Sequence, residues 1–502
     1  ILLHTQILTL RVHLSNGDLT LRWCTRGDGS ESNRFAEDLP FRAYEYNRVA
    51  AHGGSGGASH HFRRRFPADL HYGLGERAAP LVLTGRRFRL EAVDALGYDP
   101  TRSDPLYKVV PMYITLDATS GAAHGIYYDS LAAGSLDLGA EIDALWGSYT
   151  VYRADAGPLD YYVFYGPSVE KCVETYASIV GRPAPPPRYA LGYLASAMGY
   201  AEAENAQELI EAFPALCASH GIPCDVLHLS SGYTVDPANG ARNVFTWNRT
   251  RFPDPQRMFQ KLEQAGIKTV VNVKPWLLSC HPMYNQLAKE RGFVWNPETN
   301  SPSTTRLWSA GEGTTTTGSY IDLTSPTGRA FWKREATHLL SLGAAGIWND
   351  NNEMNIQDDL HTLAGAGPVG LVGRTLNTLH MAMASYEAMV EFDAGKRPFL
   401  ISRAGAPGVQ RFACQSWSGD NVSAWGTLRH NVAMGLNMGL SLFSGYGHDV
   451  GGFVGPRPSP ELFVRWVQNG IFHPRFCIHS WKAEGITEPW MYPEVGGRYN
   501  FK

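Results

Sequence analysis

The chain has 502 residues, of which 44% are hydrophobic and 18% charged, a composition typical of a globular protein with room for two or three domains. Its 44 basic and 47 acidic residues give a formal net charge of −3, which is too small to indicate nucleic acid or an anionic membrane surface as a partner. The sequence has no apolar run of about 18 residues, so we predict no membrane span. It leaves the oligomeric state and the cellular compartment open.

The N-terminal third of the sequence reads as β structure. Apolar and polar residues alternate in short runs such as 8–14 and 113–116, and Gly, Asp and Asn separate these runs. The proline-rich segment 183–187 then forms a stiff connector. We therefore predict a β domain over residues 1–182 and a second domain over residues 183–502.

Beyond the connector, apolar strands alternate with amphipathic helices, which is typical of a parallel sheet. We expect strands at 189–194, 224–229, 268–273, 343–348, 398–402, 411–417, 440–444 and 470–478. We expect helices at 168–179, 202–212, 255–263, 328–340, 375–390 and 461–468. Eight strands after one connector predict a (β/α)₈ TIM barrel, of the α/β class.

Two features of the barrel segment are unusual. Residues 276–327, between strands three and four, are rich in Thr, Ser, Gly and Pro, and a connection of that length indicates an inserted subdomain near a functional site. The eighth strand is followed by only about 24 residues. We therefore expect a barrel that is truncated after strand eight and left unclosed.

Candidate functional residues stand where strands end, because the carboxyl ends of barrel strands carry the chemistry. The fourth strand leads into Trp348-Asn349-Asp350 and then Glu353, an acidic pair among amides. The sixth leads into Trp417 and Asp420 in a similar arrangement. A single Asp after a strand is more often a turn former or a helix cap, but two Trp–Asp units on two strands favour a site.

The last two strands offer weaker candidates. Asp449 stands in the glycine-rich segment 447–453 after strand seven, where a turn with a solvated Asp is an equally good interpretation. His473 and His479 belong to strand eight. Each of these histidines, taken alone, fits a structural role better than a catalytic one.

Two carboxyl groups that face each other across a glycosidic bond perform its hydrolysis, one as an ionised nucleophile and the other as a proton donor. Rival chemistries lack support, since the sequence has no HExxH, no EF-hand loop and no P-loop. A GxGxxG match at 365–370 follows no strand. Seven scattered cysteines without a CxxC pair argue against a disulfide framework and a zinc site. We expect no metal and no cofactor.

These motifs resemble the family-31 glycoside hydrolases, which include α-glucosidases, α-xylosidases, α-galactosidases and transglucosylases. The resemblance runs from the Tyr72-Gly-Leu-Gly-Glu-Arg77 motif to about His479, roughly four-fifths of the chain. It implies an N-terminal antiparallel β-sandwich, a TIM barrel with a subdomain inserted after strand three, and a double-displacement mechanism that retains the anomeric configuration.

The resemblance also implies roles for single residues. It places the catalytic nucleophile at Asp350 and the general acid/base at Asp420. It implies that the substrate-binding residues include Asp94, Trp308, Trp348, Arg403, Asp449 and His479. We add Trp417, Asn351 and Ser230 to these substrate-binding residues.

Three positions depart from the pattern of common α-glucosidases. Ser230 stands at or near the place of an aspartate, Asn351 replaces the usual Met after the nucleophile, and Met198 stands where many relatives have Trp. A hydroxyl in place of a carboxylate weakens a charge-assisted hydrogen bond and changes which sugar hydroxyl geometry is preferred.

The leading hypothesis is therefore an exo-acting α-glycoside hydrolase that releases terminal, non-reducing α-linked glucose from oligosaccharides or glycosides. Two alternatives stay open: an α-galactosidase or α-transglucosylase of the same family, and a non-catalytic carbohydrate-binding fragment.

Overall fold

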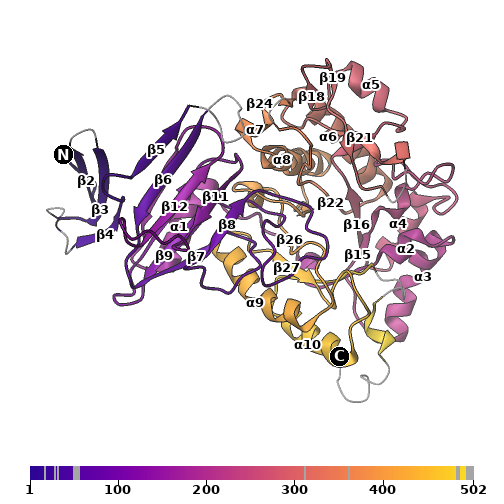
Figure 1. The fold of residues 1–502 in the computed structure, drawn as a ribbon. Helices are drawn as coiled ribbons and strands as arrows, with labels where there is room; N and C mark the ends of the chain where they lie inside the picture. The colour runs from indigo at the N-terminus through magenta and orange to yellow at the C-terminus, as the bar shows by residue number, and fades with distance from the viewer. Residues whose placement is uncertain are drawn as a thin grey trace.

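The N-terminal part of the chain forms three antiparallel sheets, which lie together on the left of Figure 1. The computed structural model describes residues 1–15, 18–27, 30, 33–48, 57–309, 313–359, 362–481 and 487–492. The first sheet comprises β1 (Leu2–His4), β2 (Leu8–Ser15), β3 (Asp18–Thr25) and β4 (Arg34–Glu37). The second runs β13 (Tyr161–Tyr165), β10 (Ala123–Tyr128), β9 (Met112–Asp117) and β7 (Asp69–Gly73). The third runs β5 (Tyr44–Asn47), β6 (Ala58–Arg64), β12 (Tyr149–Ala154), β11 (Gly134–Asp137) and β8 (Arg87–Leu90).

The second and third sheets face each other as a sandwich. Side chains of a strand point alternately to its two faces, and β9 shows both faces buried. Tyr113 packs into the cluster between the sheets, where Tyr128 stacks on Tyr152 with ring centroids 3.9 Å apart. Met112 and Ile114 point the other way, into the cluster that includes helix α1 (Val169–Val180). The expected antiparallel β-sandwich is confirmed.

The C-terminal part forms an eight-stranded parallel sheet. Its strands follow chain order around the barrel: β14 (Tyr193–Ser196), β15 (Val226–Leu229), β16 (Lys268–Val273), β22 (Gly346–Asn349), β25 (Phe399–Ser402), β26 (Ser416–Trp417), β27 (Tyr446–Asp449) and β28 (Arg475–Ile478). The predicted TIM barrel is therefore confirmed.

The barrel sheet was expected to be truncated after strand eight and left unclosed. The eighth strand pairs with the first, with Leu194 opposite Cys477. Between β25 and the segment leading into β26, one parallel bridge joins Ile401 to Gln415. The sheet is therefore nearly closed, because its two end strands, β25 and β26, are joined by this single bridge and by no ladder among the described residues. No α-helix follows β28 among the residues described up to 492, where the short 3-10 helix η6 (Pro489–Met491) lies.

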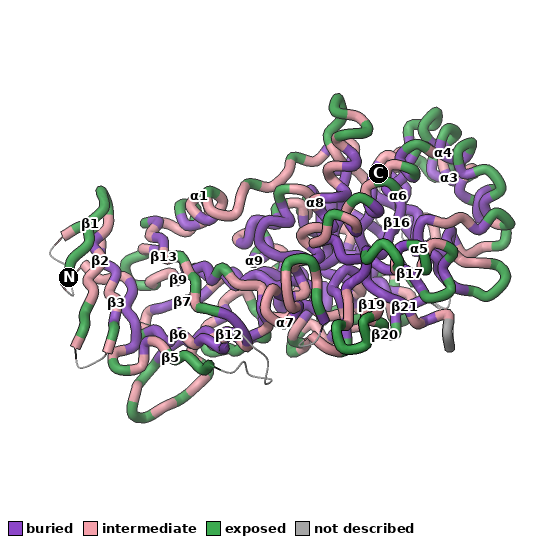
Figure 2. The backbone as a smooth tube through the Cα atoms, turned by 90° about the horizontal axis from the view of Figure 1, so that it is seen from above, coloured by how far each residue is buried: buried purple, intermediate pink, exposed green. Residues whose placement is uncertain are grey.

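Helices surround the strands, and Figure 2 shows the buried backbone at the barrel strands and exposed backbone on outer helices such as α3 and α4. They are α2 (Met198–Glu202), α3 (Ala206–Ser219), α4 (Pro255–Gln264), α6 (Pro326–Leu342), α8 (Thr375–Phe392), α9 (Trp425–Leu440) and α10 (Pro460–Gly470). In the described residues, no helix is long and apolar enough to cross a membrane.

Strand seven is the element for which the prediction failed. We predicted a strand at residues 440–444, but residue 440 ends helix α9 and residues 441–444 follow it. Helix α9 was not predicted. The seventh strand of the barrel is β27, at Tyr446–Asp449. Glycines at 426, 435 and 439 obscure the helical pattern of α9. One of them has a packing reason, since a Cβ on Gly435 would lie 2.8 Å from Cε1 of His473.

The long connection after β16 adds two small sheets above the barrel. One contains β17 (Trp276–Leu278), β21 (Thr317–Tyr320) and β20 (Thr305–Arg306). The other joins β19 (Ser301–Pro302) and β18 (Trp295–Asn296) to β23 (Leu363–Ala364) and β24 (Gly367–Pro368) of the β22–α8 connection. The domain boundary at 182/183 and the subdomain bounds at 276–327 stay predictions.

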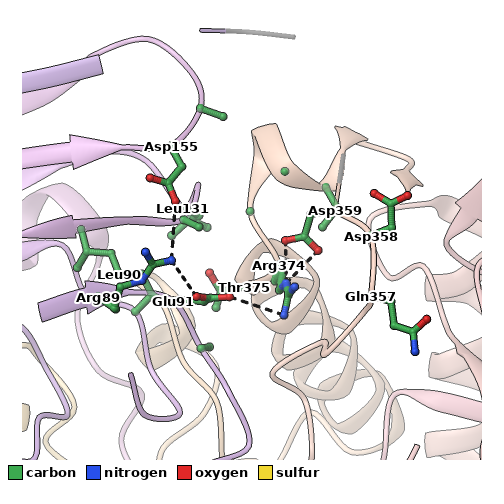
Figure 3. Close-up of a pocket in the computed structure, with 17 residues that line it drawn as sticks. Arg89, Leu90, Glu91, Leu131, Asp155, Gln357, Asp358, Asp359, Arg374 and Thr375 are labelled. Carbon is green, nitrogen blue, oxygen red and sulfur yellow. Dashed lines mark hydrogen bonds and ion pairs between the residues drawn. The ribbon is translucent and has the colours of Figure 1, made fainter. Parts of the chain in front are cut away.

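An arginine–carboxylate network links the N-terminal part to the barrel (Figure 3). Arg374, directly before α8, has Nε 2.8 Å from Asp359 Oδ2 and Nη1 3.9 Å from Glu91 Oε1. Arg89 of β8 reaches Glu91 Oε2 at 3.2 Å. Glu91 stands three residues before Asp94. The network therefore includes a residue at the start of the loop that carries Asp94 towards the barrel.

Candidate active site

A pocket opens at the carboxyl ends of the barrel strands, where the sequence predicted the site. The residues that line it are Asp94, Leu96, Met198, Ser230, Ser231, Asn272, Lys274, Trp308, Trp348, Asp350, Asn351, Arg403, Asp420, Phe453, His479 and Trp481. Nine of the eleven predicted site residues are among them. The other two, Trp417 and Asp449, are buried outside this lining.

Asp350 follows β22 and is fixed by its neighbour β16. Its backbone N–H donates to the carbonyl of Val273 at 2.9 Å. Asn272 Nδ2 and Lys274 Nζ donate to Asp350 Oδ2 at 3.0 and 2.5 Å. Burial alone would raise the pKa of Asp350, but the attraction of Lys274 and Arg403 and these hydrogen bonds outweigh it and hold the pKa well below its ordinary value. Asp350 is therefore ionised in this pocket.

The amides around Asp350 divide into two groups by their contacts. Asn349 accepts a hydrogen bond from Ser385 at 3.1 Å, and Asn352 Nδ2 donates to Ser402 Oγ at 3.0 Å, so both hold the strand end from behind. Asn351 faces the pocket with a φ of +47°, a left-handed conformation that Asn adopts more readily than most residues. The Asn-rich run is thus mainly a scaffold for the carboxylate.

Asp420 is held by a glycine turn and by the N-terminal part. Gly419 has a φ of +65°, and a Cβ there would lie 2.0 Å from the Tyr107 ring. The backbone N–H of Asp420 donates to the Tyr107 hydroxyl at 3.1 Å. Burial raises the pKa of Asp420 well above its ordinary value, Arg403 opposes this, and the charges of Asp94 and Asp350 add to the rise. The pKa of Asp420 is therefore shifted in the opposite direction to that of Asp350.

Arg403, directly after β25, is buried among four carboxyl groups. It forms a bidentate pair with Glu353, with Nε–Oε1 2.8 Å and Nη2–Oε2 2.9 Å. Its Nη2 lies 3.1 Å from Asp94 Oδ2, its Nε 3.4 Å from Asp350 Oδ1 and its Nη1 3.0 Å from Asp420 Oδ2. One guanidinium therefore contacts both Asp350 and Asp420.

Replacing Arg403 by Met is expected to destabilise the protein by about 3–5 kcal/mol, because Glu353 loses its bidentate partner while still buried. Urea denaturation followed by fluorescence measures the change, with Arg397→Met, at an exposed arginine, as the matched control. Equal midpoints for the two variants would contradict this role of Arg403.

Asp94 comes from the loop between β8 and β9 and completes the pocket from the N-terminal part. Its Oδ2 accepts from Asn351 Nδ2 at 2.9 Å and from Arg403. Its Oδ1 has no hydrogen-bond partner among the described residues. That oxygen is an acceptor suited to a ligand hydroxyl.

Aromatic rings form the floor and one wall of the pocket. Trp348 is almost completely buried and packs edge to face on His479, with centroids 5.2 Å apart. Phe453 stacks on the other side of His479 at 4.9 Å. Burial lowers the pKa of His479 to about 3, so its imidazole is neutral. Trp308, from the segment inserted after β16, supplies the wall.

Trp417 and Asp449 lie deeper than the other predicted residues. Trp417 is only 1% exposed and packs in the barrel interior against Trp348. Asp449 is the last residue of β27 rather than part of a loop, and its Oδ1 lies 3.6 Å from Nη1 of Arg475. In this structure both residues support the floor from below.

Sequence reasoning missed several residues of the pocket, of which Lys274 is the most important. Lys274 directly follows β16, so the rule that identified Asp350 would have found it as a polar residue after strand three. Trp481 follows β28 in the same way. Tyr107 could not be found by that rule, because it lies far away in the sequence.

Residues 183–500 match the family described as Glycosyl hydrolases family 31 TIM-barrel domain. Residues 8–137 match the family described as Glycosyl hydrolase 31 N-terminal galactose mutarotase-like domain. These two matches cover both parts of the fold and confirm the resemblance seen in the motifs.

Curated relatives carry α-glucosidase names. Alpha-glucosidase 2 of Bacillus thermoamyloliquefaciens is 32% identical over 443 residues, which cover 86% of this chain and 53% of that protein. Neutral alpha-glucosidase AB of Homo sapiens is 31% identical over 452 residues, which cover 84% of this chain and 46% of that protein. This chain therefore spans about half the length of these relatives.

Solved structures share the fold. A GH31 dextranase of Flavobacterium johnsoniae in complex with isomaltotriose has a TM-score of 0.84 at 21% identity, covering 98% of this chain and 57% of that one. The cycloalternan-forming enzyme of Listeria monocytogenes has a TM-score of 0.82 at 18% identity, covering 99% and 47%. With both domain matches and these relatives, the chain belongs to glycosyl hydrolases family 31.

Proposed function

We propose that this chain carries the catalytic site of a retaining, exo-acting α-glycosidase that releases terminal, non-reducing α-linked glucose. The single observation that carries the proposal is the pair Asp350 and Asp420, two buried carboxyl groups that contact one guanidinium and whose pKa values are shifted in opposite directions. A double displacement requires such a pair, with an ionised nucleophile and a protonated acid. The names of the relatives, which are α-glucosidases, favour glucose as the sugar.

In the first step, a carboxylate oxygen of Asp350 attacks the anomeric carbon while Asp420 gives its proton to the departing oxygen. The bond from the anomeric carbon to the leaving group breaks, and a β-glycosyl ester of Asp350 forms. In the second step Asp420, now ionised, takes a proton from water, and the attack of that water returns the electron pair of the ester bond to Asp350. The α configuration is restored.

The walls suit a sugar at the end of a chain. The pocket ends on Trp348 and His479, below which the barrel interior is filled, so a ligand enters from one side only. Asp94 and His479 line this pocket, and their side chains would bond ring hydroxyls of the sugar. These bonds strengthen as the ring flattens towards the transition state.

A second candidate keeps the mechanism and changes the sugar or the acceptor. Ser230, Asn351 and Met198 all line the pocket, so the three departures from common α-glucosidases lie where the sugar would bind. This favours an α-galactosidase or a transglucosylase as the alternative. A non-catalytic carbohydrate-binding protein is the third candidate, and the presence of both carboxyl groups counts against it.

The test is the release of p-nitrophenol from its α-glucoside, α-galactoside and α-xyloside, with Asp350→Asn as the control. Activity on the glucoside that is lost in the control is the expected result. Proton NMR of the first-formed sugar should show the α anomer, and the β anomer would contradict a retaining mechanism. Sugar binding in calorimetry without release from any glycoside would support the non-catalytic candidate instead.

A further inference from the structure

Lys274 is the charged residue closest to the proposed nucleophile, and its position at the end of β16 fixes it there. Its side chain is 5% exposed. Its Nζ lies 2.5 Å from Asp350 Oδ2 and also donates to Asn351 Oδ1. The ring of Trp308 lies 5.1 Å from the same ammonium. A buried ammonium in direct contact with a reacting carboxylate influences the reaction through its charge.

The two oxygens of Asp350 have different surroundings. Oδ2 accepts from both Lys274 and Asn272, at 2.5 and 3.0 Å. Among the contacts of the described residues, Oδ1 has the longer one of 3.4 Å with Arg403 Nε. A carboxylate oxygen with two short hydrogen bonds is a weaker nucleophile than its partner. The surroundings therefore select Oδ1 as the oxygen that attacks.

Asn351 orients the lysine. Its Oδ1 accepts from Lys274 while its Nδ2 donates to Asp94 Oδ2 at 2.9 Å. The three side chains form a chain of hydrogen bonds across the pocket wall, from Asp94 to the nucleophile. A Met at position 351 would offer the lysine only a weak sulfur acceptor and could not donate to Asp94, so the unusual Asn and the lysine act as a unit.

We propose that Lys274 is a positioning residue that holds Asp350 Oδ2, presents Oδ1 to the anomeric carbon and makes the Asp350 carboxylate a better leaving group in the second step. The proposal rests on the proposed glycosidase function. Lys274 gives up no proton in either step. Its charge acts on Asp350 throughout, which distinguishes its role from that of Asp420.

The charge of Lys274 affects the two steps in opposite directions. In the first step the carboxylate loses negative charge as the ester forms, so a nearby cation slows the attack. In the second step negative charge returns to the carboxylate, so the same cation speeds the departure. Removal of the lysine should therefore slow deglycosylation selectively and cause the glycosyl-enzyme to accumulate.

The experiment uses Lys274→Met with an α-glycosyl fluoride of the sugar that the p-nitrophenyl panel identifies. Fluoride needs little protonation, so the first step is fast and the second becomes visible. We expect steady-state kcat to fall at least tenfold and KM to fall with it, so that kcat/KM changes much less. A burst of about one fluoride per enzyme should precede the slow phase. Mass spectrometry should find the sugar attached to Asp350.

Three further variants make the result specific. Lys268→Met removes a lysine from the opposite end of the same strand, where it is partly exposed and pairs with Glu263, and should change neither constant. Lys274→Arg, which keeps the charge, should restore most of kcat. Lys274→Gln keeps a hydrogen-bond donor without charge and should behave like Lys274→Met, and it replaces that variant if the Met chain does not fold.

The pH profile is an independent readout. Without Lys274 the pKa of Asp350 rises towards its ordinary value, so the acidic limb of kcat/KM should move to higher pH, by about one unit or more. Equal losses in kcat and kcat/KM, without a burst and without a shifted limb, would overturn the proposal while leaving the glycosidase function intact. A wild-type chain that neither turns over nor forms an adduct with any sugar of the panel would overturn both.

Discussion

Replacing Asp350 by Asn is expected to lower kcat/KM by at least about 10⁴-fold, the loss typical of removing a covalent nucleophile. The amide cannot form the glycosyl ester, and the other carboxylates near it have different contacts. Asp94 comes from the N-terminal part and is bound to Asn351 and Arg403. Glu353 is bound to Arg403 in a bidentate pair, and Asp420 is needed as the proton donor. Initial rates on the p-nitrophenyl glycoside that the wild type cleaves measure the loss.

Two controls separate chemistry from folding in the Asp350 variant. Circular dichroism should show an unchanged secondary structure, although the midpoint of thermal unfolding should fall, since Lys274 loses the carboxylate that it pairs with. Azide added to Asp350→Gly should occupy the vacated space and restore release of the aglycone, with a β-glycosyl azide as product. Substantial activity of Asp350→Asn without any additive would rule out Asp350 as the nucleophile.

Replacing Asp420 by Ala is expected to have an effect that depends on the leaving group. A poor leaving group such as a second sugar needs the proton, and its cleavage should slow by about 10²–10⁴-fold, the range for general acid catalysis. An α-glycosyl fluoride needs little protonation, so the first step should be nearly unchanged. Comparing kcat/KM on a disaccharide and on the fluoride measures the difference. Equal losses on both substrates would contradict the acid role.

The same variant should lose the basic limb of the pH profile. The pKa of Asp420 is raised by burial and by the charges of Asp94 and Asp350, so the wild-type acid keeps its proton to a higher pH than an ordinary Asp does. Activity on the disaccharide should fall as the pH passes that pKa, because the acid is lost. Asp350, with its lowered pKa, stays ionised over the pH range of this basic limb. Without Asp420 the remaining activity should be flat across this limb.

Added azide gives a third signature of Asp420. In Asp420→Ala the glycosyl-enzyme forms from the fluoride but water lacks its general base. Azide is anionic and needs no base, so it should accelerate turnover and give an α-glycosyl azide. This product has the opposite anomeric configuration to the one expected from Asp350→Gly, so the two variants together assign the two roles.

The local pattern of the sequence was sufficient for much of the fold. The strand predicted at 268–273 has the bounds of β16, and the helix predicted at 255–263 ends one residue before α4 does. Both elements have a clear hydrophobic period and a clean start, with Pro255 at the first turn of α4 behind the cap Asp254. Helix α9 was not predicted because its glycines and its buried polar residues, such as Asn431 and Asn437, weaken the hydrophobic periodicity of the helix.

The sequence alone determined the alternation of strands and helices, apart from α9, and the polar residues that follow the strands. Asp350 and Asp420 could be located in this way, because the carboxyl ends of parallel strands all reach the same end of the barrel, whereas Arg403 was found through the family resemblance. The family motifs added their roles as expectations. None of this required a contact between distant parts of the chain.

Only the tertiary structure decided which carboxyl group is ionised. The low pKa of Asp350 depends on Lys274, which stands 76 residues earlier, and the turn of Asp420 depends on Tyr107, which stands 313 residues earlier. Burial shifts both carboxyl groups upwards, and the difference comes from which cations lie within hydrogen-bond distance. Such distances follow from the nearly closed barrel and the docked N-terminal loop, and no local pattern in the sequence contains them.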